Sequence, residues 1–179
     1  MNKKIRWITE TAIMLALLVT LQALTKGLGN QIITGSCVNT VLAVTVLVAG
    51  LSSGVTVALL SPAFAYLLGI ASQILTVPAI MIGNTVFVVL LHLICGKTLW
   101  KSVAGLLAAA VCKFAVLYVL VTHVICGVLA QPLLAQGVLK EPMLKMLPAT
   151  FSFPQLLTAL IGGAVALAIA PVLKKALRK

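Results

Sequence analysis

Lys113 is the side chain in this sequence whose position most strongly suggests ligand binding. It lies near the middle of a long apolar run, more than two helical turns from either end. An amine at such a place in a membrane needs an anion, a water-filled cavity or a route to the interface. We therefore expect Lys113 to line a ligand pocket, where an anionic group would be its natural partner. A purely structural role is the alternative.

Six further polar side chains stand inside apolar runs or at their ends, and they complete the set of candidate ligand-binding residues. They are Gln22, Asn39, Asn84, Tyr118, His123 and Gln155. When the runs are placed in a membrane, all six fall in its outer half. Apolar walls with a few convergent polar groups are typical of a small-molecule site. The asparagines could instead join helices by hydrogen bonds, and the glutamines and His123 also suit the membrane interface.

Residue types that support catalysis or metal binding are scarce. Glu10 and Glu141 are the only acids, and they lie on opposite sides of the expected membrane. No Walker-type glycine loop, HExxH motif or paired Cys/His ligand set occurs. The four scattered cysteines suit small buried apolar positions. We expect a protein that is not an enzyme, uses no metal or other cofactor, and takes its energy from elsewhere.

Composition places the chain among integral membrane proteins. Of its 179 residues, 62% are hydrophobic and only 8% are charged, which is too apolar for a soluble domain of this size. The net charge of +11 comes from basic residues at the ends of apolar runs, with no clustered basic surface. We expect a lipid membrane as a partner and no nucleic acid.

Six apolar runs predict six transmembrane helices in a single all-α domain spanning residues 1–179. A helix of some 20 residues crosses the ~30 Å hydrocarbon core. The expected helices cover about 6–26, 31–49, 53–70, 78–95, 100–129 and 154–173. The first lacks a small-residue cleavage site, so we expect a retained span and no signal peptide. Residues 131–153 contain three prolines and are expected to form a long loop.

The distribution of basic residues predicts that both termini are cytoplasmic. With the N-terminus inside, nine basic residues face the cytoplasm and three face outward, which is a clear positive-inside bias. The cytoplasmic set is Lys3, Lys4, Arg6, Lys97, Lys101, Lys174, Lys175, Arg178 and Lys179. The outer set is Lys26, Lys140 and Lys145.

Ala12 and Ala16 give the first helix a face without bulk. They are four residues apart, so their methyl groups lie one above the other. Small residues at this spacing allow close approach of another helix. That helix could belong to a partner protein or to the same bundle.

The chain resembles the substrate-binding S components of energy-coupling factor (ECF) transporters. These proteins have six helices, fewer than two hundred residues, cytoplasmic termini and an AxxxA signature in the first helix, which here is Ala12-Ile-Met-Leu-Ala16. The resemblance implies a multi-pass protein of the bacterial cell membrane that binds a vitamin or related micronutrient from outside with high affinity. It implies that Ala12 and Ala16 dock onto a transmembrane coupling protein, which two ATPase subunits energise. Residues 27–30 would form a lid over the site.

The identity of the ligand stays open. Trp7 and Trp100, which could stack on a flat ring, both belong to the cytoplasmic side, and this disfavours a large flavin-like ligand. Lys113 favours an acid, such as a pantothenate- or nicotinate-like compound. The alternative function is a stand-alone small solute transporter or channel that is not coupled to ATP.

Overall fold

The computed structural model describes residues 2–70, 73–96 and 98–177, and within these ranges all regular structure is helical. In chain order the α-helices are α1 (Lys3–Lys26), α2 (Gln31–Val44), α3 (Leu51–Leu67), α4 (Val77–Ile94), α5 (Leu99–Tyr118), α6 (Ala130–Ala135), α7 (Glu141–Thr150) and α8 (Phe153–Ala176). Two of them continue as π-helical segments, α2 through Thr45–Ala49 and α5 through Val119–Val128, and a short 3-10 turn, Ile74–Thr76, precedes α4. The predicted all-α class is confirmed.

Five helical stretches in the described part of the chain are long and apolar enough to cross a membrane. They are Lys3–Lys26, Gln31–Ala49, Ile74–Ile94, Leu99–Val128 and Glu141–Ala176. α3 is also apolar but has only 17 residues. At ~1.5 Å per residue it is about 26 Å long, a little less than the hydrocarbon core. These lengths and compositions are those of a helical membrane protein.

The turn between α1 and α2 is fixed by two residues that suit it. Gly29 has φ +63°, a left-handed conformation that glycine adopts without steric cost. Asn30 then caps α2, because its side-chain oxygen accepts hydrogen bonds from the backbone N–H groups of Ile32 at 2.9 Å and Ile33 at 3.3 Å. This short turn brings the end of α1 beside the start of α2.

Glycines on the helix faces bring neighbouring backbones into close contact. A Cβ atom on Gly162 of α8 would lie 2.5 Å from the backbone oxygen of Ser36 and 2.7 Å from Cβ of Asn39, both on α2. Ala166 and Ala170 continue the buried face of α8. Close packing through small residues is how helices associate in membranes, and α2 and α8 form such a closely packed pair.

The segment expected as a loop, residues 131–153, is instead largely helical, and that expectation was wrong. It forms α6 and α7, and Leu147 and Phe151 at the end of α7 are buried with Val121 and Ile125. Pro142 occupies the first turn of α7, where its missing N–H costs no hydrogen bond. One of the three prolines of the expected loop therefore lies at the start of a helix.

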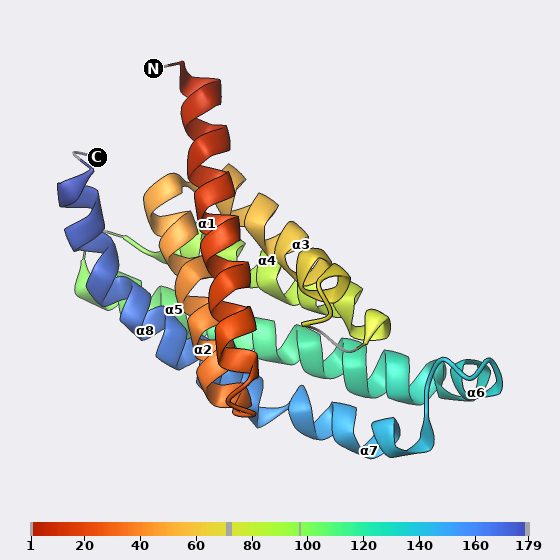
Figure 1. Cartoon of the computed structure of the whole chain (residues 1–179). Helices are drawn as coiled ribbons and strands as arrows, with labels where there is room; N and C mark the ends of the chain where they lie inside the picture. Colours follow the sequence, from red (N-terminus) through yellow and green to blue (C-terminus); the bar gives the residue numbers. More distant parts are fainter. Residues whose placement is uncertain (1, 71–72, 97, 178–179) are drawn as a thin grey trace.

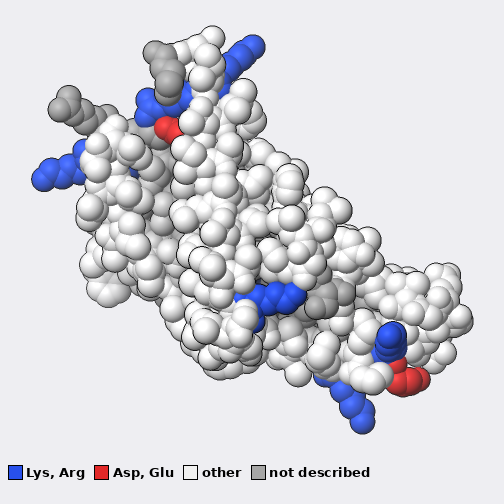
Figure 2. All heavy atoms as spheres, in the orientation of Figure 1, with Lys and Arg blue, Asp and Glu red and all other residues white. Residues whose placement is uncertain are grey.

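Both chain termini lie at one end of the molecule, and α7 lies toward the other end with the α1–α2 turn (Figure 1). Figure 2 shows charged side chains toward the two ends of the visible face, basic atoms at one place near its middle, and a mostly uncharged surface elsewhere. Lys97, Arg178 and Lys179, which were counted in the charge pattern, lie outside the described residues.

Candidate functional site

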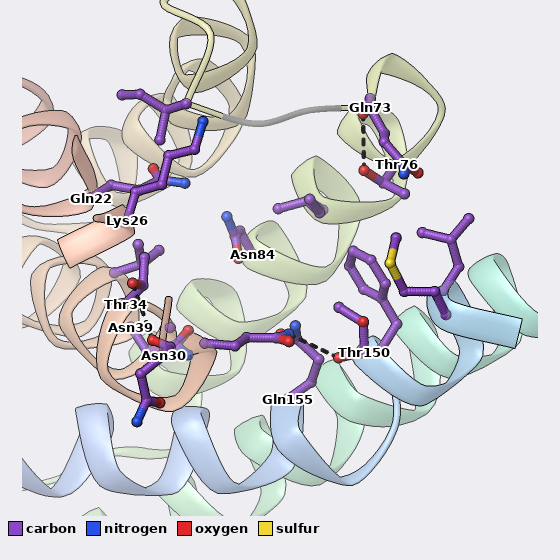
Figure 3. A pocket seen from close by; sticks show the side chains of 18 of the residues that line it. Gln22, Lys26, Asn30, Thr34, Asn39, Gln73, Thr76, Asn84, Thr150 and Gln155 are labelled. Atoms are coloured by element: carbon purple, nitrogen blue, oxygen red, sulfur yellow. Dashed lines mark hydrogen bonds between the residues drawn. The ribbon is translucent and has the colours of Figure 1, made fainter. Parts of the chain in front are cut away.

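A cavity of about 460 Å³ opens at the end of the bundle that lies away from the termini. Its volume falls within the range of about 300–1,000 Å³ that is usual for small-molecule sites. Helices α1, α2, α4, α5, α7 and α8 all contribute to its wall, as does the α1–α2 turn (Figure 3). The polar lining residues are Gln22, Lys26, Asn30, Gln31, Thr34, Asn39, Gln73, Thr76, Asn84, Lys113, Thr150 and Gln155.

The structure brings five of the seven candidate ligand-binding residues to this cavity. They are Gln22, Asn39, Asn84, Lys113 and Gln155. They come from five different helices, so no local sequence motif could have joined them. Their expected depth along the helices was the property that they shared, because the cavity occupies one end of the bundle.

Tyr118 and His123 do not line the cavity. Both are exposed on the outer side of the bundle, where their rings pack edge to face with centroids 5.7 Å apart. Tyr118 follows Lys113 by five residues, which at 3.6 residues per turn places it about 140° around the helix. Their expected position along the helix did not determine whether their side chains point into the cavity or away from the bundle.

Because of this placement, replacing Tyr118 and His123 together with alanine should leave ligand binding unchanged. The measurement is the amount of small molecule that co-purifies with the variant, determined by mass spectrometry after extraction. A loss of bound molecule as large as that caused by replacing Asn39 would show that the rings belong to the site after all.

Lys113 is the centre of the polar floor of the cavity. Its side chain is 2% exposed, and Nζ donates hydrogen bonds to Oδ1 of Asn39 at 2.6 Å and Oδ1 of Asn84 at 2.7 Å. Nζ also lies 5.2 Å from the centroid of the Phe87 ring, within range of a cation–π interaction. Three helices are thereby joined around one amine.

The two asparagine side chains can adopt only one orientation around this amine. An ammonium group donates hydrogen bonds and accepts none, so each amide must turn its oxygen toward Nζ. The nitrogen of Asn39 is then directed to Thr158, whose Oγ1 accepts its hydrogen bond at 3.2 Å. Thr158 in turn donates to the backbone oxygen of Gln155 at 3.1 Å.

The nitrogen of Asn84 has no such partner. Nδ2 is buried and makes no hydrogen bond, and the residue is only 1% exposed. In Figure 3 this nitrogen points toward the open centre of the cavity. Buried donors are nearly always satisfied, so an unsatisfied one on a cavity wall marks a place where a ligand atom would be stabilised.

The mouth of the cavity is held by two further contacts that the sequence did not reveal. Gln31 donates from Nε2 to the backbone oxygen of Thr150 at 3.0 Å, which ties the first residue of α2 to the last residue of α7. Lys26 donates from Nζ to the backbone oxygen of Gly69 at 2.6 Å. In the sequence, Lys26 contributes only to the charge pattern, and residues 141–150 fall within the expected loop, so neither is a candidate there.

The charge lining the cavity is of one sign. Lys26 and Lys113 are its charged lining residues, and no acid of the described chain is among them. Of the two acids, Glu10 lies on the half of α1 nearer the N-terminus, where it pairs with Arg6 at 2.9 Å. The cavity therefore presents a positive field to a ligand.

A second hollow of about 590 Å³ lies at the end that holds the termini, between the α4–α5 connection and α8. Lys174 is its charged lining residue among those described. None of the buried polar atoms without a hydrogen-bond partner, as far as the chain is described, belongs to its wall. The cavity that contains Lys113 is therefore the better candidate for a specific ligand.

Ala12 and Ala16 are both exposed on α1. This helix faces the rest of the bundle through its buried residues Thr11 and Leu18, and Thr11 donates to the hydroxyl of Ser53 at 2.9 Å. The two alanines therefore do not serve packing within this chain. Their face is open to a partner or to lipid.

Comparisons with protein-family models, with curated proteins and with solved structures gave no match to this chain. Any assignment of function therefore depends on the sequence pattern and on the geometry of the cavity.

Proposed function

We propose that this chain is the membrane-embedded substrate-capture subunit of an ECF-type importer. It binds a vitamin-sized micronutrient from outside and delivers it with a transmembrane coupling protein and two ATPase subunits. The observation that carries this proposal is the cavity of about 460 Å³, whose floor is a buried network of hydrogen bonds at one end of a membrane-type bundle. The volume suits a ligand of vitamin size.

The proposed topology has six crossings in the bacterial cell membrane, with both termini in the cytoplasm. Termini at the same end of the bundle fit an even number of crossings, and α3 would supply the sixth (Figure 1). The basic residues near the termini fit a cytoplasmic location for that end. The cavity would then open outward, as capture from outside requires.

Delivery requires energy that the chain does not supply by itself. Its sequence contains no Walker-type glycine loop for ATP. The exposed face with Ala12 and Ala16 is the proposed contact for the coupling protein, because methyl-sized side chains let a partner helix approach closely.

The Gln31–Thr150 contact should slow release of the ligand through the mouth. Replacing Gln31 with alanine removes this hydrogen bond, and we expect dissociation to become about two- to tenfold faster, which corresponds to the net value of one hydrogen bond. The measurement is the release rate of the co-purifying molecule into ligand-free buffer. Gln136→Ala, an exposed glutamine outside the cavity, is the matched control. Equal release rates for both variants would show that the Gln31–Thr150 hydrogen bond does not slow release of the ligand.

Uptake in cells with and without the ATPase subunits tests the proposed function. Cells producing the chain together with an ECF coupling protein and both ATPase subunits should accumulate a radiolabelled vitamin from a mixed panel. Cells producing an ATPase variant that cannot hydrolyse ATP should bind the same compound without accumulating it. Equal accumulation in both strains would favour the second candidate, a stand-alone transporter, to which the membrane-type helices and the cavity are equally suited.

A further inference from the structure

We propose that the floor of the cavity is an anion-binding site, where Lys113 and Asn84 together hold a carboxylate, so that the captured molecule is a small organic acid. This inference rests on the proposed capture function and specifies the chemical class of its ligand. It is carried by the hydrogen bonds of Lys113 and by the unsatisfied nitrogen of Asn84.

The first step is the lack of a counter-charge for Lys113. Its ammonium has three N–H donors, and two of them are used on the amide oxygens of Asn39 and Asn84, which are uncharged acceptors. The Phe87 ring offers only a weak electrostatic contact at 5.2 Å. A buried charge normally has a partner of opposite sign, and no described acid lines the cavity. A ligand anion would supply that partner.

The second step is the spacing of the two available donors. Nζ of Lys113 is 2.7 Å from Oδ1 of Asn84. The covalent geometry of an amide places Nδ2 about 2.2 Å from that oxygen, so the two nitrogens lie at most about 5 Å apart. The two oxygens of a carboxylate are separated by a similar ~2.2 Å, and each can accept one hydrogen bond of ~2.8 Å. One carboxylate can therefore bridge Nζ and Nδ2.

The third step is the character of the remaining walls. Lys26 adds a second positive charge near the mouth, which attracts anions and repels cations. Glutamine side chains, such as Gln22 and Gln155, offer uncharged hydrogen-bonding groups above the floor, and Phe151 adds an apolar surface. These walls fit an acid whose body is neutral, with both polar and apolar parts.

Matched pairs of small molecules test the inference on the full-length chain in mild detergent. The probes are nicotinate with nicotinamide, benzoate with benzamide, and pantothenate with pantothenol, which differ within each pair in the carboxylate. We expect one or more of the acids to raise the Tm of the protein in a concentration-dependent way, while the neutral member of the same pair does not.

Two variants and one control locate the effect. Lys113→Met removes the cation, and Asn84→Asp replaces the free N–H donor with a carboxylate that neutralises Lys113 within the protein. Each should weaken binding of the acid by about 10- to 100-fold, the value of a charge-assisted hydrogen bond. Asn84→Asp keeps the shape of the side chain and gives Lys113 a partner, so it remains folded even if Lys113→Met does not. Lys145→Met removes one exposed positive charge from α7 outside the cavity lining and should bind the acid as the unmodified chain does.

Three results would overturn the anion site. Equal stabilisation by both members of every pair would mean that the carboxylate of the ligand does not contribute to binding. The capture function would then stand without the anion site. Undiminished binding of the acid by Asn84→Asp would place the anion elsewhere. No stabilisation by any acid would also reject the site, and ATP-dependent accumulation in the uptake experiment would then show whether the proposed function survives without it.

Discussion

Replacing Ala12 or Ala16 with tryptophan is expected to abolish uptake while leaving ligand binding intact. Both alanines are exposed near the middle of α1, and neither of them lines the cavity. An indole at either position would hold a partner helix several ångströms away from α1 and remove the close contact that small residues allow. Uptake should fall to the level of cells without the chain, and the amount of co-purifying ligand should stay unchanged.

Ile13→Trp provides the matched control for this prediction. Ile13 is 59% exposed on the same helix. It lies ~100° around the helix from Ala12, so a tryptophan there projects to the side of the face that carries the two alanines. Its uptake should remain close to that of the unmodified chain. Normal uptake by both alanine variants would rule out docking through this face.

Gly162→Ala is expected to lower the free energy of unfolding by about 1–3 kcal/mol, the usual cost of forcing extra volume into a well-packed interface. The added methyl would lie 2.5 Å from the backbone oxygen of Ser36 and 2.8 Å from the backbone nitrogen of Thr40. Neither backbone atom can move without shifting α2 away from α8. Because Asn39 stands at this contact and Thr158 accepts its hydrogen bond, the same shift should also weaken ligand binding.

The control for Gly162→Ala is Gly127→Ala in the π-helical segment. There the nearest atom to an added methyl is the backbone oxygen of Thr122, at an ordinary 3.5 Å. Chemical denaturation of both variants in the same detergent gives the comparison. Equal stability of the two variants would mean that the α2–α8 contact is more adaptable than its geometry indicates.

The sequence predicted the all-α class, and five of the seven candidate residues that it grouped by their expected depth line one cavity. Apolar runs and their flanking lysines follow directly from composition, and Asn39, Asn84 and Lys113 were recognisable because polar groups inside such runs are costly. Depth alone could not determine the facing of a side chain, which depends on how each helix rotates against its neighbours. Tyr118 and His123 were therefore grouped with the site although they lie outside it.

The mouth of the cavity was not predictable, because its parts depend on tertiary contacts. Residues 141–150 contain two prolines, and the helix there is stabilised by burial of Leu147 with Val121 and Ile125 of the π-helical segment, a contact that the sequence does not reveal. Similarly, Lys26 stands in the sequence at the end of an apolar run, like the other basic residues that flank such runs. Its approach to Gly69 depends on how closely α1 packs beside α3.

Native mass spectrometry of the full chain, produced in its own host and released gently from mild detergent, tests the central claim most directly. The capture proposal predicts a bound small molecule of vitamin size, together with complexes that retain the coupling protein and ATPase subunits. The spectrum of the Asn84→Asp variant, recorded in the same way, should lack that small molecule. A chain that carries neither a small molecule nor partner subunits would contradict the proposal and favour a stand-alone transporter.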